Sequence, residues 1–163
     1  MYDKILVTLE ATPTDRAIIE HIKALAVAMH SRVVLLHVAD GWAARTYGPE
    51  AVSDEITEDK AYLEKVRNEF RSVGVKAEAE LAYGDPSQEI VKWVEKEGCD
   101  LVAMSTHGHR FIADIFLGTT AHHVRHNINV PLLLVRAKVS GHAESVGDRG
   151  ALPRLRGRGE QGD

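Results

Sequence analysis

Five short apolar segments, separated by stretches with the spacing of amphipathic helices, constrain the fold more than any other feature of this sequence. The apolar segments are 5–7, 33–38, 75–81, 101–104 and 130–135. Short continuous apolar runs rich in β-branched residues are typical of buried strands. Strands that alternate with helices along a chain form a mostly parallel sheet with both faces covered. The sequence therefore predicts an α/β fold built on one five-stranded sheet.

The helical stretches carry their own start signals. Helices are predicted over 12–29, 54–73, 85–98 and 119–127. At the first start, Thr12 is expected to cap, Pro13 to take the first helical position and Asp15 to lie in the first turn. At the third start, Asp85 is expected to cap, with Gln88 placed to complete a capping box.

The chemistry of the strands predicts their order in the sheet. Segment 75–81 alternates apolar with charged residues, as edge strands do, and Pro131 cannot donate to a ladder. These two strands are therefore placed at the edges, which gives the order 3-2-1-4-5 in an open, twisted, three-layer, Rossmann-like fold. Right-handed crossovers then move the helices to the other face between strands one and four. Ligands bind at such a switch point, outside the carboxyl ends, which are here residues 9–11 and 105–108.

A loop with two glycines, residues 105–119, follows the fourth apolar run directly. Gly108 tolerates unusual backbone angles and lets a ligand approach the main chain. Gly118-Thr119 lies where the fourth helix begins, and amides at a helix start are unpaired and attract anions. The spacing indicates a phosphate-sized anion site with the Thr119 hydroxyl as a further donor. An ordinary structural loop is the alternative that spacing leaves open.

Four short motifs in residues 1–137 are similar to those of a known family. They are Lys4-Ile5-Leu6-Val7, His37-Val38, Gly84-Asp85-Pro86, and 100–104 leading into the glycine loop. Nine residues separate Gly108 from Gly118-Thr119, which matches the second half of the motif Gly-x2-Gly-x9-Gly-Ser/Thr. The chain thus resembles the universal stress proteins of the UspA superfamily. The resemblance implies the adenine nucleotide alpha-hydrolase-like variant of the Rossmann-like fold.

The resemblance also implies a ligand and the residues that hold it. It implies binding of ATP, or of ADP or AMP, with or without Mg²⁺, by a protein that acts as a stress-response regulator. The main chain at Gly108 and Gly118 would hold phosphates, the Val38 backbone would meet adenine, and an acidic residue after strand one would meet the ribose. His109 and Arg110 are expected either to reach phosphate or to lie on the surface. The expected contact residues are Leu9, Glu10, Ala11, Val38, Met104, Ser105, His107, Gly108, His109, Arg110, Gly118, Thr119 and Thr120.

Two departures from the family pattern keep alternatives open. Ser105 stands where the first motif glycine belongs, which costs about 1 kcal/mol or more if that position needs a positive φ. Glu10-Ala11 stands where the family usually has Asp-Gly. A branch of the family lacks the glycines and does not bind ATP, so an interaction dimer without nucleotide is one alternative. A weak ATPase is the other.

No motif in the sequence predicts a catalytic or a metal-binding residue. No Ser-His-Asp, Cys-His or paired-carboxylate arrangement has a recognisable spacing. His122 and His126 lie four residues apart, as zinc ligands can, but no cysteine or carboxylate motif completes a site. Slow ATP hydrolysis is therefore the most that is expected in the way of enzymatic activity.

Composition and charge set the remaining expectations. The 163 residues are divided into one domain, 1–137, and a glycine-rich tail, 138–163, that is predicted to be disordered. A formal charge of −4 gives no footprint for nucleic acid or for an anionic membrane, and no apolar run is long enough to span one. Cys99 is the single cysteine, as expected for a cytoplasmic protein. The family pairs its subunits through the last strand, which implies a homodimer contact at Val130, Leu132, Leu133, Leu134 and Val135.

Overall fold

The structure, a computed structural model, describes residues 1–41, 46–48, 54–106 and 119–136. Its strands are β1 Lys4–Leu9, β2 Arg32–Ala39, β3 Ala77–Tyr83, β4 Leu101–Thr106 and β5 Leu132–Arg136. All neighbouring strands pair in parallel, in the order β3-β2-β1-β4-β5. The predicted sheet and its strand order are confirmed.

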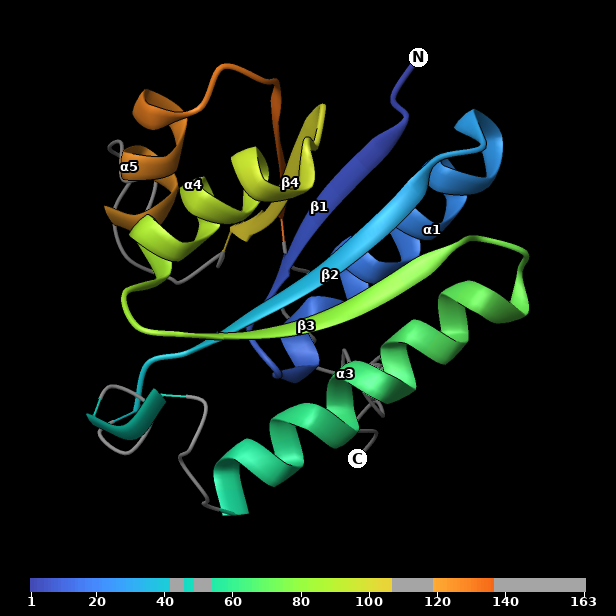
Figure 1. Ribbon diagram of the computed structural model, residues 1–163. Helices are drawn as coiled ribbons and strands as arrows, with labels where there is room; N and C mark the ends of the chain where they lie inside the picture. The colour runs from blue at the N-terminus through green and yellow to red at the C-terminus, as the bar shows by residue number, and fades with distance from the viewer. Residues whose placement is uncertain (42–45, 49–53, 107–118, 137–163) are drawn as a thin grey trace, which may run out of the picture.

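Helices cover both faces of this sheet and complete three layers (Figure 1). The helices are α1 Arg16–Met29, α3 Asp54–Ser72, α4 Pro86–Glu97 and α5 Thr119–Asn127, with a 3₁₀ turn at Pro13–Asp15. The first two pack on one face and the last two on the other. Over the described ranges, no helix combines the length and the apolar character needed to cross a membrane.

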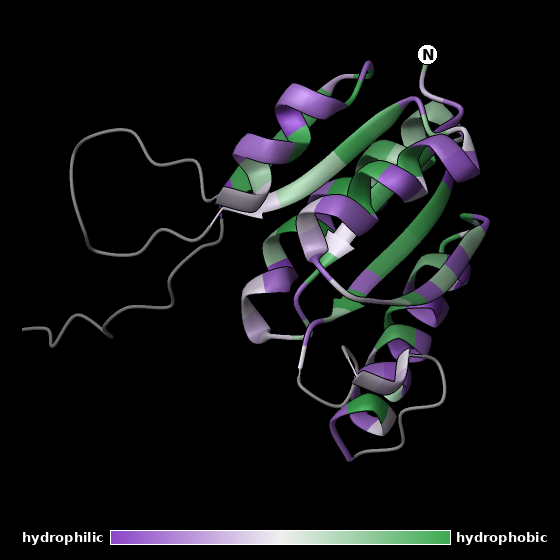
Figure 2. Ribbon diagram, turned by 60° about the vertical axis from the view of Figure 1, so that its left-hand side comes forward, coloured by the Kyte–Doolittle hydropathy of each residue, from purple (hydrophilic) through white to green (hydrophobic). Residues whose placement is uncertain are grey.

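The core is divided by the sheet into two apolar clusters, because successive strand residues point to opposite faces. Ile5 and Val7 pack with Phe70 on the α1/α3 face, whereas Leu6 and Val102 pack on the α4/α5 face. All five side chains are fully buried, and each such burial contributes about 1.5–3 kcal/mol. Figure 2 shows the apolar colour concentrated on the central strands and the polar colour on the outer sides of the helices.

The two edge strands differ from each other and from their predicted ends. β3 starts at Ala77, two residues after the predicted start, and carries the exposed Glu78 on its outer side. β5 starts at Leu132, so Pro131 precedes the strand and does not lie inside it as predicted. Pro131 has no N–H to pair, yet its carbonyl accepts a hydrogen bond from the Val102 amide at 3.0 Å. β5 is apolar and only half-buried along Leu132–Val135.

The two predicted helix starts have different outcomes. Asp85 caps α4, because its carboxylate accepts a hydrogen bond from the Gln88 amide at 3.1 Å. The Thr12 side chain makes no cap hydrogen bond; its hydroxyl lies 2.5 Å from the Thr14 hydroxyl, and a 3₁₀ turn precedes α1. Asp15, predicted for an ordinary first turn, is fully buried.

Candidate functional site

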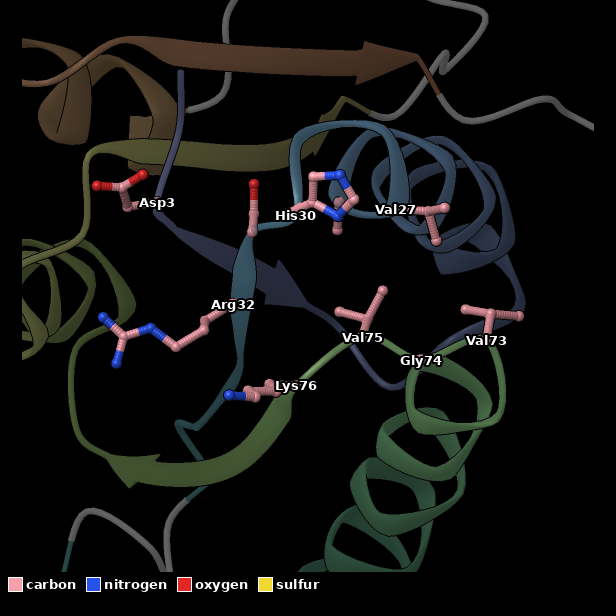
Figure 3. Close-up of a pocket in the computed structure, with 10 residues that line it drawn as sticks. Asp3, Val27, His30, Arg32, Val73, Gly74, Val75 and Lys76 are labelled. Carbon is pink, nitrogen blue, oxygen red and sulfur yellow. The ribbon is translucent and has the colours of Figure 1, made fainter.

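Among the cavities bordered by described residues, two lie at opposite ends of the sheet. The larger, of about 690 Å³, lies where the strands begin (Figure 3). In that view Val27 and Val73 lie on one side, while Arg32 and Lys76 extend to the other, so charged and apolar groups do not converge on one point. In open α/β sheets ligands bind beyond the carboxyl ends of the strands. The cavity of about 520 Å³ at those ends is therefore the candidate site.

This second cavity opens where the strand order reverses. The pairing of β1 with β4 stops at Val7 and Ala103, so the last residues of both strands border a crevice. The lining residues are Thr8, Leu9, Glu10, Leu36, His37, Val38, Asp40, Pro86, Ile90, Met104, Ser105, Thr106, Thr119, Thr120 and Ala121.

Most of the predicted contact residues that the structure describes meet in this cavity. The structure brings together Leu9, Glu10, Val38, Met104, Ser105, Thr119 and Thr120. Ala11 is not among the described residues that line it. The other predicted residues, His107, Gly108, His109, Arg110 and Gly118, lie outside the part of the chain that the structure describes.

The cavity has an apolar floor and a polar rim. Leu36, Ile90 and Met104 are almost fully buried and form part of the α4/α5 cluster. Hydroxyl groups come from the ends of β1 and β4 and from the start of α5, where Thr119 and Thr120 line the cavity. Because the first amides of a helix have no partner within it, the start of α5 brings donors to the rim.

The end of β2 presents main-chain polar groups to the crevice. The Arg32 amide donates to Asp3 of the β1 side at 2.9 Å, whereas the Val33 amide donates to Lys76 of the β3 side at 2.9 Å. This alternation turns the backbone of even-numbered β2 residues, Val38 included, toward β1. By the same offset the Val38 amide faces the carbonyl of Leu9, the last residue of β1, and the Val38 carbonyl faces the place where the ladder stops.

The two departures from the family motif have different backbone consequences. Ser105 lies inside β4 and is paired in register with Val135, and it is not among the described residues with positive φ. The strain considered for a serine at this position therefore does not arise. Its Oγ is buried and has no hydrogen-bond partner among the described residues. Ala11, in contrast, has φ of 57°, a left-handed conformation that favours glycine.

A buried carboxylate holds the loop that follows β1. Asp15 is 0% exposed and accepts hydrogen bonds from the Glu10 amide, at 2.9 Å to Oδ2, and from the Tyr62 hydroxyl, at 2.8 Å. Burial raises the pKa of Asp15 above its usual range, although the hydrogen bonds from Tyr62 and the loop amides oppose the shift. Burial, followed by the hydrogen bond to Asp15, also raises the pKa of Tyr62, so its phenol keeps its proton.

A histidine on β2 holds the same loop from the other side. His37 Nδ1 lies 2.8 Å from the Leu9 carbonyl oxygen, and its Nε2 lies 3.3 Å from Asp59 Oδ2. Since a carbonyl oxygen carries no proton, Nδ1 is the donor in the first contact. The Asp59 carboxylate, 8% exposed, accepts from Nε2 when the ring carries its second proton.

Sequence reasoning missed several residues of this region. Asp40 lines the cavity directly after β2, and the topological argument that selected Glu10 at the end of β1 applies to it equally. Thr8 and Thr106 also line the cavity. His37 belongs to a family motif in the sequence, and nothing in the local pattern predicts its contacts.

The histidine pair with zinc-like spacing, which no further motif completes, lies on α5. The rings of His122 and His126 are 4.5 Å apart between centroids and tilted by 55°. Across the described ranges, no three side chains of histidine, cysteine, aspartate or glutamate gather in a way that would hold a metal ion.

Comparison with known proteins agrees with this architecture. Residues 1–136 match the Universal stress protein family. Universal stress protein MJ0577 of Methanocaldococcus jannaschii is 31% identical over 159 aligned positions, which cover 86% of this chain and 98% of that protein. A solved structure of MJ0577 matches with a TM-score of 0.70 and 32% identity, over 86% of this chain and 99% of its own.

Two more distant structures share the fold. A universal stress protein solved in complex with cAMP has a TM-score of 0.63 and 17% identity, over 84% of this chain and 98% of its own. One from Archaeoglobus fulgidus, in complex with dAMP, has a TM-score of 0.62 and 19% identity, over 82% and 98%. The matched family, the near relative and the strand order agree, and this chain belongs to the universal stress protein family.

Proposed function

We propose that this protein binds an adenine nucleotide, ATP foremost, in the cavity at the carboxyl ends of β1 and β4, and that it acts as a nucleotide-responsive regulator in stress. The observation that carries the proposal is that one cavity has an apolar part and a polar part. An apolar floor and the turned-out backbone of Val38 lie beside two carboxylates, Glu10 and Asp40. Hydroxyls and the start of α5 lie across from them.

The apolar part suits the nucleoside. A purine ring is flat and apolar on its faces, so Leu36, Ile90 and Met104 offer it a surface. Its polar edge needs main-chain partners, for which the Val38 backbone is turned in the right direction. Carboxylates accept hydrogen bonds from hydroxyl groups, which assigns the ribose to Glu10 at the end of β1.

The start of α5 suits the phosphates. Helix amides and the hydroxyls of Thr119 and Thr120 are donors, and the positive end of the helix dipole favours an anion. The family resemblance assigns phosphate contacts to Gly108 and Gly118 as well, and His107, His109 and Arg110 are further expected contact residues outside the described ranges. Mg²⁺ would accompany a triphosphate and screen its charge.

The structural neighbours favour an adenine nucleotide over other anions. Two universal stress proteins of the same fold were solved with cAMP and with dAMP. A regulator needs a ligand that prefers one state of the protein, since a ligand shifts an equilibrium only by its differential affinity. We assign that role to ATP, whose binding would bias a dimer or partner surface.

Thermal unfolding with and without ATP and Mg²⁺ tests the proposal. A ligand at 100 times its dissociation constant adds about 2.7 kcal/mol, which raises the Tm of a chain this size by about 5–10 °C. The variant Glu10→Ala should retain part of the shift, because it leaves the phosphate donors in place. No shift at millimolar ATP, and no nucleotide found by mass spectrometry in natively purified protein, would reject nucleotide binding and favour the nucleotide-free interaction protein.

A second proposal concerns assembly. We propose that two copies pair through β5, because its side chains Leu132–Val135 are apolar and half-buried at an edge of the described sheet. A charge on such an edge blocks pairing. Val135→Lys should therefore give a monomer in analytical ultracentrifugation, while Glu78→Lys on the opposite edge should leave the dimer intact. A monomeric wild-type protein would reject this proposal.

A further inference from the structure

The peptide unit between Leu9 and Glu10 is held on both of its polar atoms. Its carbonyl oxygen accepts a hydrogen bond from His37 Nδ1 at 2.8 Å. Its N–H donates to Asp15, at 2.9 Å to Oδ2 and 3.2 Å to Oδ1. β1 ends at Leu9, which is still in register with His37, so the bond to Asp15 extends the order of the strand to the Glu10 amide beyond the last rung.

Each gripping side chain also contacts a side chain of α3. The Tyr62 hydroxyl donates to Asp15 Oδ2 at 2.8 Å, and Asp59 Oδ2 lies 3.3 Å from His37 Nε2. Asp59 and Tyr62 are three residues apart, so they lie on the same face of the helix. Neither lines the cavity, whereas Leu9, Glu10 and His37 do.

This arrangement places two carboxylates in buried positions to hold a single peptide unit. Asp15 and Asp59 are buried carboxylates, and burying a carboxylate is costly unless hydrogen bonds compensate. A glutamate also has one more rotatable bond than an aspartate, so Glu10 loses more freedom when it binds a ligand. When the backbone of Glu10 is already fixed, the main chain loses less conformational entropy on ligand binding.

We propose that Asp15 and His37, supported by Tyr62 and Asp59 of α3, are positioning residues that fix the Leu9–Glu10 peptide and so aim the Glu10 carboxylate at the ribose hydroxyls. This inference rests on the proposed nucleotide site. It makes α3 a determinant of ribose recognition although α3 contributes no described residue to the cavity. Loss of either support should weaken the contact with the ribose and leave the contact with the phosphates unchanged.

The test compares two nucleotides that differ only in the ribose. ATP and 2′,3′-dideoxy-ATP are titrated calorimetrically against the full chain, with inorganic tripolyphosphate as the probe of the phosphate end. A hydrogen bond to a carboxylate corresponds to about tenfold in affinity, so the wild-type protein should prefer ATP about tenfold. Glu10→Ala should bring that ratio to about one.

Two conservative variants remove the supports. Tyr62→Phe deletes one hydroxyl, and Asp59→Asn removes one charge, both at residues that do not line the cavity. Each should lower the ratio at least threefold while the tripolyphosphate affinity stays within twofold of wild type. Tyr83→Phe is the matched control: it deletes the hydroxyl of a tyrosine that packs against Ala39 and Ile56 and is not among the described residues that line the cavity, and it should keep the wild-type ratio.

The outcomes separate this inference from the proposed function. A wild-type protein that binds neither nucleotide rejects the proposed function and the inference with it. Equal binding of both nucleotides by the wild type, or wild-type ratios in both support variants while Glu10→Ala loses discrimination, rejects the inference alone. A parallel loss of ATP and tripolyphosphate binding would show a general structural role and would also reject it.

Discussion

Replacing Asp15 with alanine tests whether the buried carboxylate organises the loop after β1. The substitution leaves several donors without their acceptor, among them the Glu10 amide and the Tyr62 hydroxyl, whose hydrogen bonds to Asp15 are both part-buried. An unsatisfied buried donor costs about 1–3 kcal/mol, and the alanine protein recovers part of this because no charge is buried. We expect Asp15→Ala to lower the free energy of unfolding by about 3 kcal/mol.

A double-mutant cycle assigns that cost to the contact with Tyr62. In the wild-type background, Tyr62→Phe removes a hydrogen bond to a carboxylate and should cost about 2 kcal/mol. In the Asp15→Ala background the phenol already lacks its acceptor, so the same change should cost nothing or stabilise the protein. The coupling energy should then be about 2 kcal/mol, well above the few tenths seen for independent sites.

Urea denaturation followed by circular dichroism measures all four proteins. The comparison is valid if the dependence of the unfolding free energy on urea is the same in each. A loss below about 1 kcal/mol in Asp15→Ala, or additive effects of the two substitutions, would refute the reasoning that Asp15 is held by these donors.

Three further predictions follow from local features. Ala11→Gly should leave the unfolding free energy unchanged or raise it by up to about 1 kcal/mol, because the φ of Ala11 is 57°. Ala24→Gly, on the exposed face of α1, is the control and should lower the unfolding free energy by about 1 kcal/mol in the same urea assay. Cys99 is buried and its pKa is raised to about 11, so mass spectrometry should find it unlabelled by iodoacetamide at pH 8 in native protein and labelled in urea. The hydrogen bond from Lys4, at 2.5 Å, lowers the pKa of Glu97. This pair therefore stabilises the fold above the unfolded pKa of the carboxyl group, and the stabilisation is lost as pH falls through the lower folded pKa. The difference in unfolding free energy between Lys4→Met and the wild type, measured by urea denaturation, should therefore become smaller in acid.

The fold was predictable because its signals are local and repeated. The alternation of apolar and charged residues over 75–81 fixed which side of β3 faces the core, even though the strand itself begins at Ala77. Pro131 indicated an edge strand for a sound reason, the missing N–H, but the same property places it before the strand. The ends of strands depend on pairing partners distant in sequence, so they are the less predictable part.

The site was predictable only as far as topology reaches. Glu10 follows from the position of a strand end and Val38 from the family resemblance, and the structure places both at one cavity. Asp15 was assigned to a helix start because the local pattern of threonine, proline and aspartate is typical of one. Its actual partner, Tyr62, lies 47 residues away, and no periodicity connects the two.

The two edge strands of the sheet differ in chemistry, and this difference limits how many copies can associate. β3 carries charged side chains along its outer face, whereas β5 presents an apolar margin. When two copies pair through β5, the edge strand that each copy leaves exposed is β3, which carries charged side chains. Pairing through the described sheet would therefore end with a dimer, because its described strands offer no second apolar edge on which a polymer could continue.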